Sequence, residues 1–329
     1  MHHRPMPFDF DAAVQAPFRM QPGLRRLAPG TPQLTLLPPG SRHQREKLAV
    51  LSAFWPQALC AAPGFDPSTA LQSLCAEAAQ AHPAAWQWDG HRAAATALGA
   101  AVGPGGAIQH TAAGIFGLGD EITRCLQGIE SRWRLAALLS LTFAEDLAVV
   151  DAATGTIPWL AVALPSHWAP EAKVGRPFGA VHGPVADNRL LIGASDSLMR
   201  LATAGERWER FVWTITDHPR LHAHPARVPT ERWVDTPVAR AWWRTEHQTF
   251  LPVPGAPSPQ AVFTIHVEVR PLSRALALPQ QAAAVRAAVA SMSPAVLAYR
   301  GLETVREPLL AWLAARAAEG PARPPGFAA

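Results

Sequence analysis

The residue types best suited to ligand binding or catalysis lie in one segment, SHWAPEAKVGRPFGAVHGPVADN, at positions 166–188. One of its histidines, His182, follows an Ala-Val pair and precedes Gly-Pro. A solvated loop does not require the Trp and Val residues of this segment, and a regular helix does not tolerate its Gly and Pro. An imidazole in apolar surroundings with one free ring nitrogen suits an axial haem ligand or a catalytic base. A histidine that only packs in the core is the alternative, and residue types alone favour it.

The sequences around the other histidines do not favour a metal-binding or catalytic role. Three of them share the Pro- and Arg-flanked segment HPRLHAHPAR: His218, His222 and His224. An H-x-H pair can bind a metal ion from a strand, but this turn-like composition predicts a solvated loop. His266 stands beside Glu268 on the polar face of a predicted strand, so we expect a half-exposed side chain. His167 lies in a Pro-bounded loop and is expected to be exposed.

Sequence motifs of several other enzyme classes are absent. The Gly-rich stretches GPGGA at 103–107 and GIFGLGD at 114–120 lack the spacing of a dinucleotide fingerprint, and no Walker A, HExxH or GxSxG motif occurs. The cysteines, Cys60, Cys75 and Cys125, form no CxxC or CxxCH pattern. No Cys/His ligand spacing occurs either, so the sequence supports neither a disulfide framework, a zinc site nor covalent c-type haem attachment.

Composition narrows the class of protein. Hydrophobic residues make up 49% of the 329 residues and charged ones 16%, so the chain can bury a core. The net charge is +4, and the 29 basic residues are scattered rather than clustered, which argues against nucleic-acid binding. We find no long uncharged apolar window and no leader-like start. We therefore expect a cytoplasmic protein without a membrane segment.

Hydrophobic periodicity predicts helices first, an antiparallel sheet in the middle and helices last, which is an α+β fold. Helices are expected at 46–59, 68–81, 120–146 (in one or two pieces), 279–301 (broken near Pro294) and 307–318. Strands are expected in a hairpin at 147–166 and at 210–218 and 260–272. The domain prediction is an extended arm at 1–45, a single domain at 46–320 and a disordered tail at 321–329.

Several segments resemble, in order, one known family. The stretch PSHWAPEAKVGRPFGAVHGPVADN is similar to the Pro-Ser-x-Trp … Lys-x-Gly … Ile-His-x-Pro-Val-Pro pattern of the family that contains the α subunit of haem-dependent oxidative N-demethylase. Further matching segments are APFRMQPGLRRL, FAEDLAVV, ERFVWTI and TEHQTFLPVP…AVFTIHVEVRPL. The chain departs from the pattern at Val212, His247 and Ala186, where the family has Asn, Arg and Pro.

The resemblance implies a PAS-like antiparallel sheet that cradles haem b, with flanking helices. It makes His182 the axial ligand of the iron, and Gly175 one of the glycines that let the backbone approach the porphyrin. Lys173 and Arg210 become partners of the haem propionates, and Trp213 packs against the macrocycle or the core. A surface lysine, and a strand-end arginine paired with a neighbouring Glu, are the alternatives.

Two carboxylates fall in the matched segments, Glu246 and Asp146. The resemblance makes each a candidate to accept a proton during the reaction, and a structural salt bridge is the alternative for each.

The activity that the resemblance implies is haem-dependent monooxygenation: oxidative N-dealkylation, or a related O2-dependent oxidation, of a small amine. Electrons would come from a separate reductase, since the chain carries no flavin, nicotinamide or iron–sulfur motif. Two alternatives stay open: a non-catalytic haem-based sensor or carrier, and a haem-free interaction protein that kept the fold. The sequence does not decide the substrate, the reductase or whether the chain forms a homo-oligomer.

Overall fold

The structure is a computed structural model, and it describes residues 8–181, 183, 186–187 and 192–319. His182, the predicted axial ligand, and the predicted tail at 321–329 lie outside the described residues.

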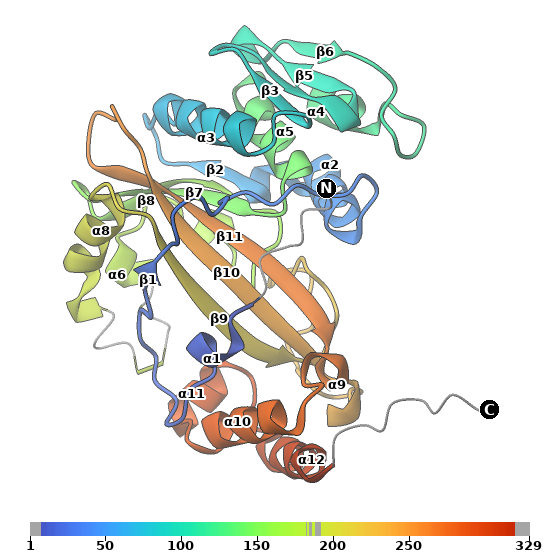
Figure 1. Cartoon of the computed structure of the whole chain (residues 1–329), viewed down its shortest axis with the longest axis vertical. Helices are drawn as coiled ribbons and strands as arrows, with labels where there is room; N and C mark the ends of the chain where they lie inside the picture. Colours follow the sequence, from blue (N-terminus) through green and yellow to red (C-terminus); the bar gives the residue numbers. More distant parts are fainter. Residues whose placement is uncertain (1–7, 182, 184–185, 188–191, 320–329) are drawn as a thin grey trace.

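An antiparallel seven-stranded sheet forms the centre of the fold, and its strand order is β1-β9-β10-β11-β7-β8-β2 (Figure 1). The strands in that order are β1 Arg25–Arg26, β9 Trp208–Thr216, β10 Trp242–Pro252, β11 Gln260–Pro271, β7 Asp146–Asp151, β8 Thr156–Ala161 and β2 Leu59–Ala61. The predicted hairpin is confirmed as β7–β8, and β9 and β11 fall where strands were predicted. The central strand β10 was not predicted.

The two faces of this sheet follow from its register, because residues directly opposite each other on antiparallel strands share a face. Glu246 of β10 is opposite Val212 of β9 and Val267 of β11. Its neighbour His247 is opposite Phe211 and His266. We call these the Glu246 face and the His266 face. Arg210, Arg244 and Gln248 lie on the Glu246 face, and Glu209, Trp213 and Glu268 lie on the His266 face.

Helices and a small second sheet lie at the two ends of the large sheet (Figure 1). One end carries α2 Arg42–Ala58, α3 Ser68–Ala81, α4 Glu121–Gln127 and α5 Arg134–Thr142, together with the four-stranded sheet β3 Trp86–Trp88, β4 Ala93–Ala95, β5 Ala100–Val102 and β6 Ile108–His110. The other end carries α1 Phe10–Ala13, α9 Leu272–Ala275, α10 Pro279–Ala290, α11 Pro294–Tyr299 and α12 Arg306–Ala318. Beside β8 lie α6 Phe178–Val181 and α8 Ser195–Thr203. Short 3-10 turns are η1 Thr96–Leu98, η2 Pro104–Gly106, η3 Ser131–Trp133, η4 Pro170–Ala172 and η5 Val238–Arg240.

The predicted helix at 68–81 is confirmed with both ends in place. The helix predicted at 46–59 begins earlier, at Arg42, because the Ser41 hydroxyl accepts the backbone N–H of Gln44 and caps it. It also continues past Pro56, with Phe54 in a non-helical conformation. A proline removes one backbone bond of the helix, and here the chain kinks instead of stopping.

The small second sheet was missed because two of its strands are nearly all alanine, which has little preference for strands. Burial explains why these strands form. Ala93, Ala95 and Ala100 are at most 1% exposed. Small side chains let this sheet pack closely against its neighbours.

The described part of the predicted N-terminal arm is more structured than expected. It contains α1, β1 and the start of α2, and it inserts Leu34 and Val14 into two separate apolar clusters. The arm therefore contributes to the core at both ends of the sheet. Among the described residues, no helix has both the length and the apolar character that crossing a bilayer requires.

Candidate functional site

Near the middle of β10 lies a carboxylate whose two oxygens each accept a hydrogen bond. Glu246 Oε1 accepts a hydrogen bond from the Ser166 hydroxyl, and Oε2 accepts one from Gln248 Nε2 at 2.6 Å. The buried Arg244 in turn donates from Nε to Ser166 Oγ at 2.7 Å. Because these donors come from two segments, the Glu246 carboxylate is held in one orientation on its face of the sheet.

The negative charge of Glu246 acts on three cations, Lys173, Arg210 and Arg244. Burial lowers the pKa of Lys173 to about 8, and the negative charge of Glu246 opposes that shift. Burial also lowers the pKa of Arg210, again opposed by Glu246. Lys173 Nζ lies 4.3 Å from the centre of the Trp168 ring. The structure thus brings together Lys173, Arg210 and Glu246, all of which were nominated from the sequence. We call these three residues the Glu246 cluster.

Arg210 is incompletely paired among the described residues. Its Nε is buried and has no hydrogen-bond partner there. The acidic neighbours expected in the alternative interpretation are engaged elsewhere: Glu209 pairs with Arg25 and His247, and Glu206 pairs with Arg26. A buried guanidinium nitrogen without a partner is costly, so Arg210 is suited to an anionic ligand.

Two further residues reach this region from the C-terminal helices and were not assigned a role from the sequence. Tyr299 ends α11, and burial raises the pKa of its hydroxyl, with Glu246 adding to the increase. Arg300 donates to the backbone oxygen of Trp213, while its Nε is buried without a partner in the described part of the chain. The sequence signal was the YRG motif at 299–301, which resembles the family but carries no chemistry by itself.

A cavity of about 290 Å³ lies beside these arginines, beneath the N-terminal arm. Phe18, Arg210, Trp213 and Arg300 are among its lining residues. Its volume is at the lower end of the range for small-molecule sites. Cationic groups with unused donors and an apolar wall suit the carboxylates of a flat, mostly apolar ligand such as haem, so the chemistry of these residues fits that group. Neither Lys173 nor Glu246 is among the residues that line the cavity.

Asp146, the second nominated carboxylate, has a different environment. Its Oδ1 lies 3.2 Å from Lys47 Nζ, and both side chains are at most 1% exposed. Its Oδ2 accepts the backbone N–H of Leu164 at 2.6 Å. Lys47 also donates to the carbonyls of Phe143 and Glu145. These contacts join α2 to β7 and favour the structural alternative over proton transfer.

Trp213 and Gly175 are set apart from the Glu246 cluster. Trp213 lies on the His266 face, stacks on Trp243 with ring centres 4.8 Å apart and donates from Nε1 to the carbonyl of Ala13. Gly175 has a φ of +73° and donates its N–H to the carbonyl of Ile157 at 2.8 Å. That left-handed conformation favours glycine, and it positions the loop that carries Lys173 against β8.

The expected exposure of two histidines in the Pro-bounded loops was wrong. His167 is half-buried, with a φ of +61°, and its Nε2 is enclosed without a partner among the residues that the structure describes. Its ring centre lies 5.2 Å from that of His218. Burial lowers the pKa of His167 to about 3 and that of His218 to about 4. Both rings are therefore neutral at physiological pH.

The HPRLHAHPAR segment is not a solvated loop, and His266 is not half-exposed. His224 is 3% exposed and donates from Nε2 to Glu171 at 3.0 Å, because its Nδ1 accepts the N–H of Ala226. His266 is 6% exposed, since α2 and the segment before β7 cover its face of the sheet. Both predictions failed because the covering residues come from distant parts of the chain.

A family model described as haem-dependent oxidative N-demethylase, alpha subunit-like, matches residues 120–310, which is more than half of the chain. The matched region contains Lys173, Arg210, Glu246 and Tyr299. None of the curated proteins compared with the chain matches it.

Proposed function

The chain belongs to the haem-dependent oxidative N-demethylase, alpha-subunit-like family, and on this premise we propose that it binds haem b and oxidises a small amine with O2. The observation that carries the proposal is the Glu246 cluster: Arg210 shares a face of the sheet with the fixed Glu246 carboxylate, and Lys173 of a neighbouring loop interacts with the same charge. The antiparallel sheet with its flanking helices is the scaffold in which we propose a PAS-like haem cradle.

Lys173 and Arg210 would hold the haem propionates. The unused Nε of Arg210 and the lowered pKa of Lys173 support this role, because an added anion would satisfy both groups. His182 remains the proposed axial ligand on the sequence resemblance alone. Haem supplies O2 binding and one-electron chemistry, and the protein supplies the ligand, the pocket and the proton-transfer groups.

Glu246 would bind the ammonium form of the substrate. Two propionates would neutralise Lys173 and Arg210, and Arg244, the third cation that interacts with Glu246, hydrogen-bonds to Ser166 and to main-chain carbonyls instead of to the carboxylate. Ser166 and Gln248 hold its oxygens in place, so an amine N–H can donate to it in a defined orientation. A carboxylate in this position can also hold the proton that the amine must lose before it is oxidised. Electrons would come from a separate reductase.

The test is the optical spectrum of the full chain produced with a haem precursor, compared with His182→Ala. The expected result is a Soret band that shifts with dithionite and with CO, and that is displaced or lost in the variant. Release of formaldehyde from an N-methylated secondary amine, with an artificial electron donor, then tests the reaction.

Three outcomes separate the functions. Haem binding with amine oxidation supports the enzyme. Haem binding without turnover of any small amine favours a haem-based sensor or carrier. A colourless, folded protein that takes up no haemin overturns both haem functions and leaves the haem-free interaction protein.

A further inference from the structure

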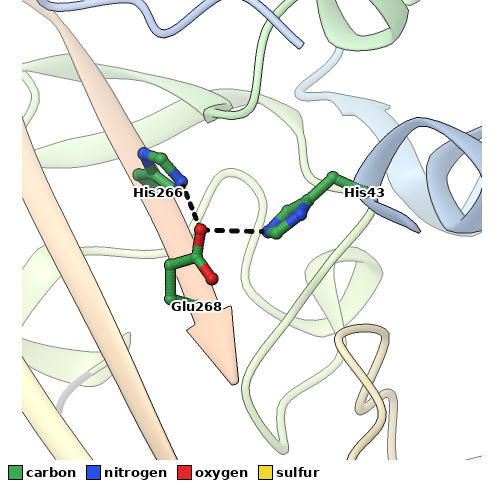
Figure 2. Close-up of side chains that lie close together, drawn as sticks. All are labelled: His43, His266 and Glu268. Carbon is green, nitrogen blue, oxygen red and sulfur yellow. Dashed lines mark ion pairs between the residues drawn. The ribbon is translucent and has the colours of Figure 1, made fainter. Parts of the chain in front are cut away.

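A second cluster of ligand-type side chains lies on the His266 face of the sheet, away from Glu246. His43 comes from the first turn of α2, and His266 and Glu268 are two residues apart on β11 (Figure 2). Glu268 Oε1 lies 3.4 Å from His266 Nε2 and 3.9 Å from His43 Nε2. One ligand atom of each residue lies within 4.8 Å of those of the other two.

These distances between side-chain atoms are close to the distances between the ligand atoms of a single bound metal ion. A tetrahedral zinc ion with bonds of roughly 2.0–2.2 Å places its ligand atoms about 3.4 Å apart. The Glu268–His266 edge already has this length, and the Glu268–His43 edge is 3.9 Å. The third edge, between the two histidines, is within 4.8 Å, so side-chain rotation that shortens it would bring the three ligand atoms around one ion.

The second ring nitrogen of His266 has the partner that metal-bound histidines usually have. His266 Nδ1 lies 3.3 Å from Oε1 of Glu145, a carboxylate that is 3% exposed. The other oxygen of Glu145 accepts the backbone N–H of Thr35 at 2.8 Å, which holds the carboxylate in place. A carboxylate bound to the far nitrogen fixes the ring orientation and directs the opposite nitrogen to the ion.

The cluster is accessible on one side. The Glu268 side chain is 31% exposed, whereas those of His43 and His266 are 14% and 7% exposed. His43 Nε2 donates to the carbonyl of Val267 at 2.7 Å, so metal binding would exchange this bond for one to the ion and move the ring proton to Nδ1. His266 would give up the proton that its Nε2 shares with Glu268. A fourth ligand position would face the solvent side and take water.

We propose that His43, His266 and Glu268 bind one divalent transition-metal ion of the zinc type, and that Glu145 orients His266. Two imidazoles and one carboxylate favour such ions over Mg²⁺ and Ca²⁺, which prefer all-oxygen sites. The ion would connect the start of α2 to β11. The site goes beyond the proposed haem function and does not depend on it, because its residues lie on the opposite face of the sheet.

The test is equilibrium dialysis of the full chain against ZnCl2, followed by elemental analysis of zinc and iron in the same samples. Wild type is expected to retain about one zinc per chain and to unfold at a higher temperature with zinc than with MgCl2. Glu268→Gln and His43→Gln are expected to lose stoichiometric zinc. Glu145→Gln is expected to keep the site with zinc affinity lowered roughly 10- to 100-fold.

His247→Gln is the matched control, because His247 is a half-buried histidine on the same face, directly opposite His266, and pairs with Glu209 instead. It is expected to retain zinc. Circular dichroism identifies any variant that fails to fold. Folded wild type that binds no zinc, or a His43→Gln/Glu268→Gln double variant that keeps it, overturns the proposal. Iron content reports haem separately, so failure of one proposal is distinguishable from failure of the other.

Discussion

The two faces of the large sheet carry polar clusters that both use alternate residues of β9 and β10, yet the clusters differ in how their charges are satisfied. On the His266 face, acids and bases pair with one another: Glu209 accepts from Arg25 Nε and lies 2.8 Å from His247 Nε2. On the Glu246 face, Arg210 keeps a buried nitrogen without a partner in the described residues. A protein leaves such a group unpaired where a ligand completes it.

The pKa values of Lys173 and His266 illustrate this difference between the two faces. Burial alone lowers the pKa of a basic group, as it does for Lys173, to about 8. Burial acts in the same direction on His266, but its bonds to Glu145 and Glu268 outweigh it and raise the pKa to about 9. At His266, charge pairing therefore outweighs burial, whereas burial still lowers the pKa of His247 despite its Glu209 partner. Four changes test the comparison between the two faces.

The largest effect is expected from Asp146→Ala, which leaves Lys47 buried without its counter-ion. Removing one partner of a buried ion pair costs about 3–5 kcal/mol. The free energy of unfolding, measured with urea, should fall by that amount. Glu246→Gln is the matched change on the same face of the sheet and should cost about 1 kcal/mol or less, because its carboxylate is not in a fully buried ion pair. Equal losses would contradict the distinction between a structural and a functional carboxylate.

Glu246→Gln should instead lower amine oxidation. A charged hydrogen bond to the substrate contributes roughly 1.5–3 kcal/mol, so kcat/KM should fall by about 10- to 100-fold while haem content stays unchanged. Steady-state kinetics with a methylated amine gives the value. An unchanged kcat/KM in the variant would show that Glu246 does not bind the substrate.

Arg210→Met should weaken haemin binding by roughly tenfold, since it removes a charge-assisted contact to a propionate. Titration of the haem-free protein, followed by the Soret band, measures the affinity. His247→Gln, on the other face of the sheet, should leave haemin affinity unchanged. A similar loss in both variants would indicate a general effect on folding.

A pH-dependent effect is expected from His167, which borders the Glu246 cluster through Ser166. Its pKa is lowered by burial to about 3, below the ordinary value of 6.5, so the unfolded chain binds more protons between these values. The free energy of unfolding should therefore fall as the pH drops below 6.5, by at most about 1.4 kcal/mol per pH unit. His167→Asn should flatten this slope in urea unfolding between pH 4 and 7, and an unchanged slope would exclude His167 as its source.

Local patterns were sufficient for much of the fold. The helix at 68–81, the β7–β8 hairpin and the alternation along β11 depend on neighbours in sequence, and each is where the sequence predicted it. The resemblance also nominated Lys173, Arg210 and Glu246, which the fold brings together.

Partners across the fold could not be predicted in this way. Asp146 binds Lys47, and His266 is covered by His43 and Glu145, so each contact joins segments that are distant along the chain. Trp213 and Arg210 lie in one predicted strand, but side chains alternate along a strand, and only its pairing with β10 decides which of them shares a face with Glu246. The sequence by itself determined the elements and the candidate residues, because both depend on residue type and short spacing. Tertiary structure decided which charges are paired and which are not, because burial and ion pairing arise only when distant segments meet.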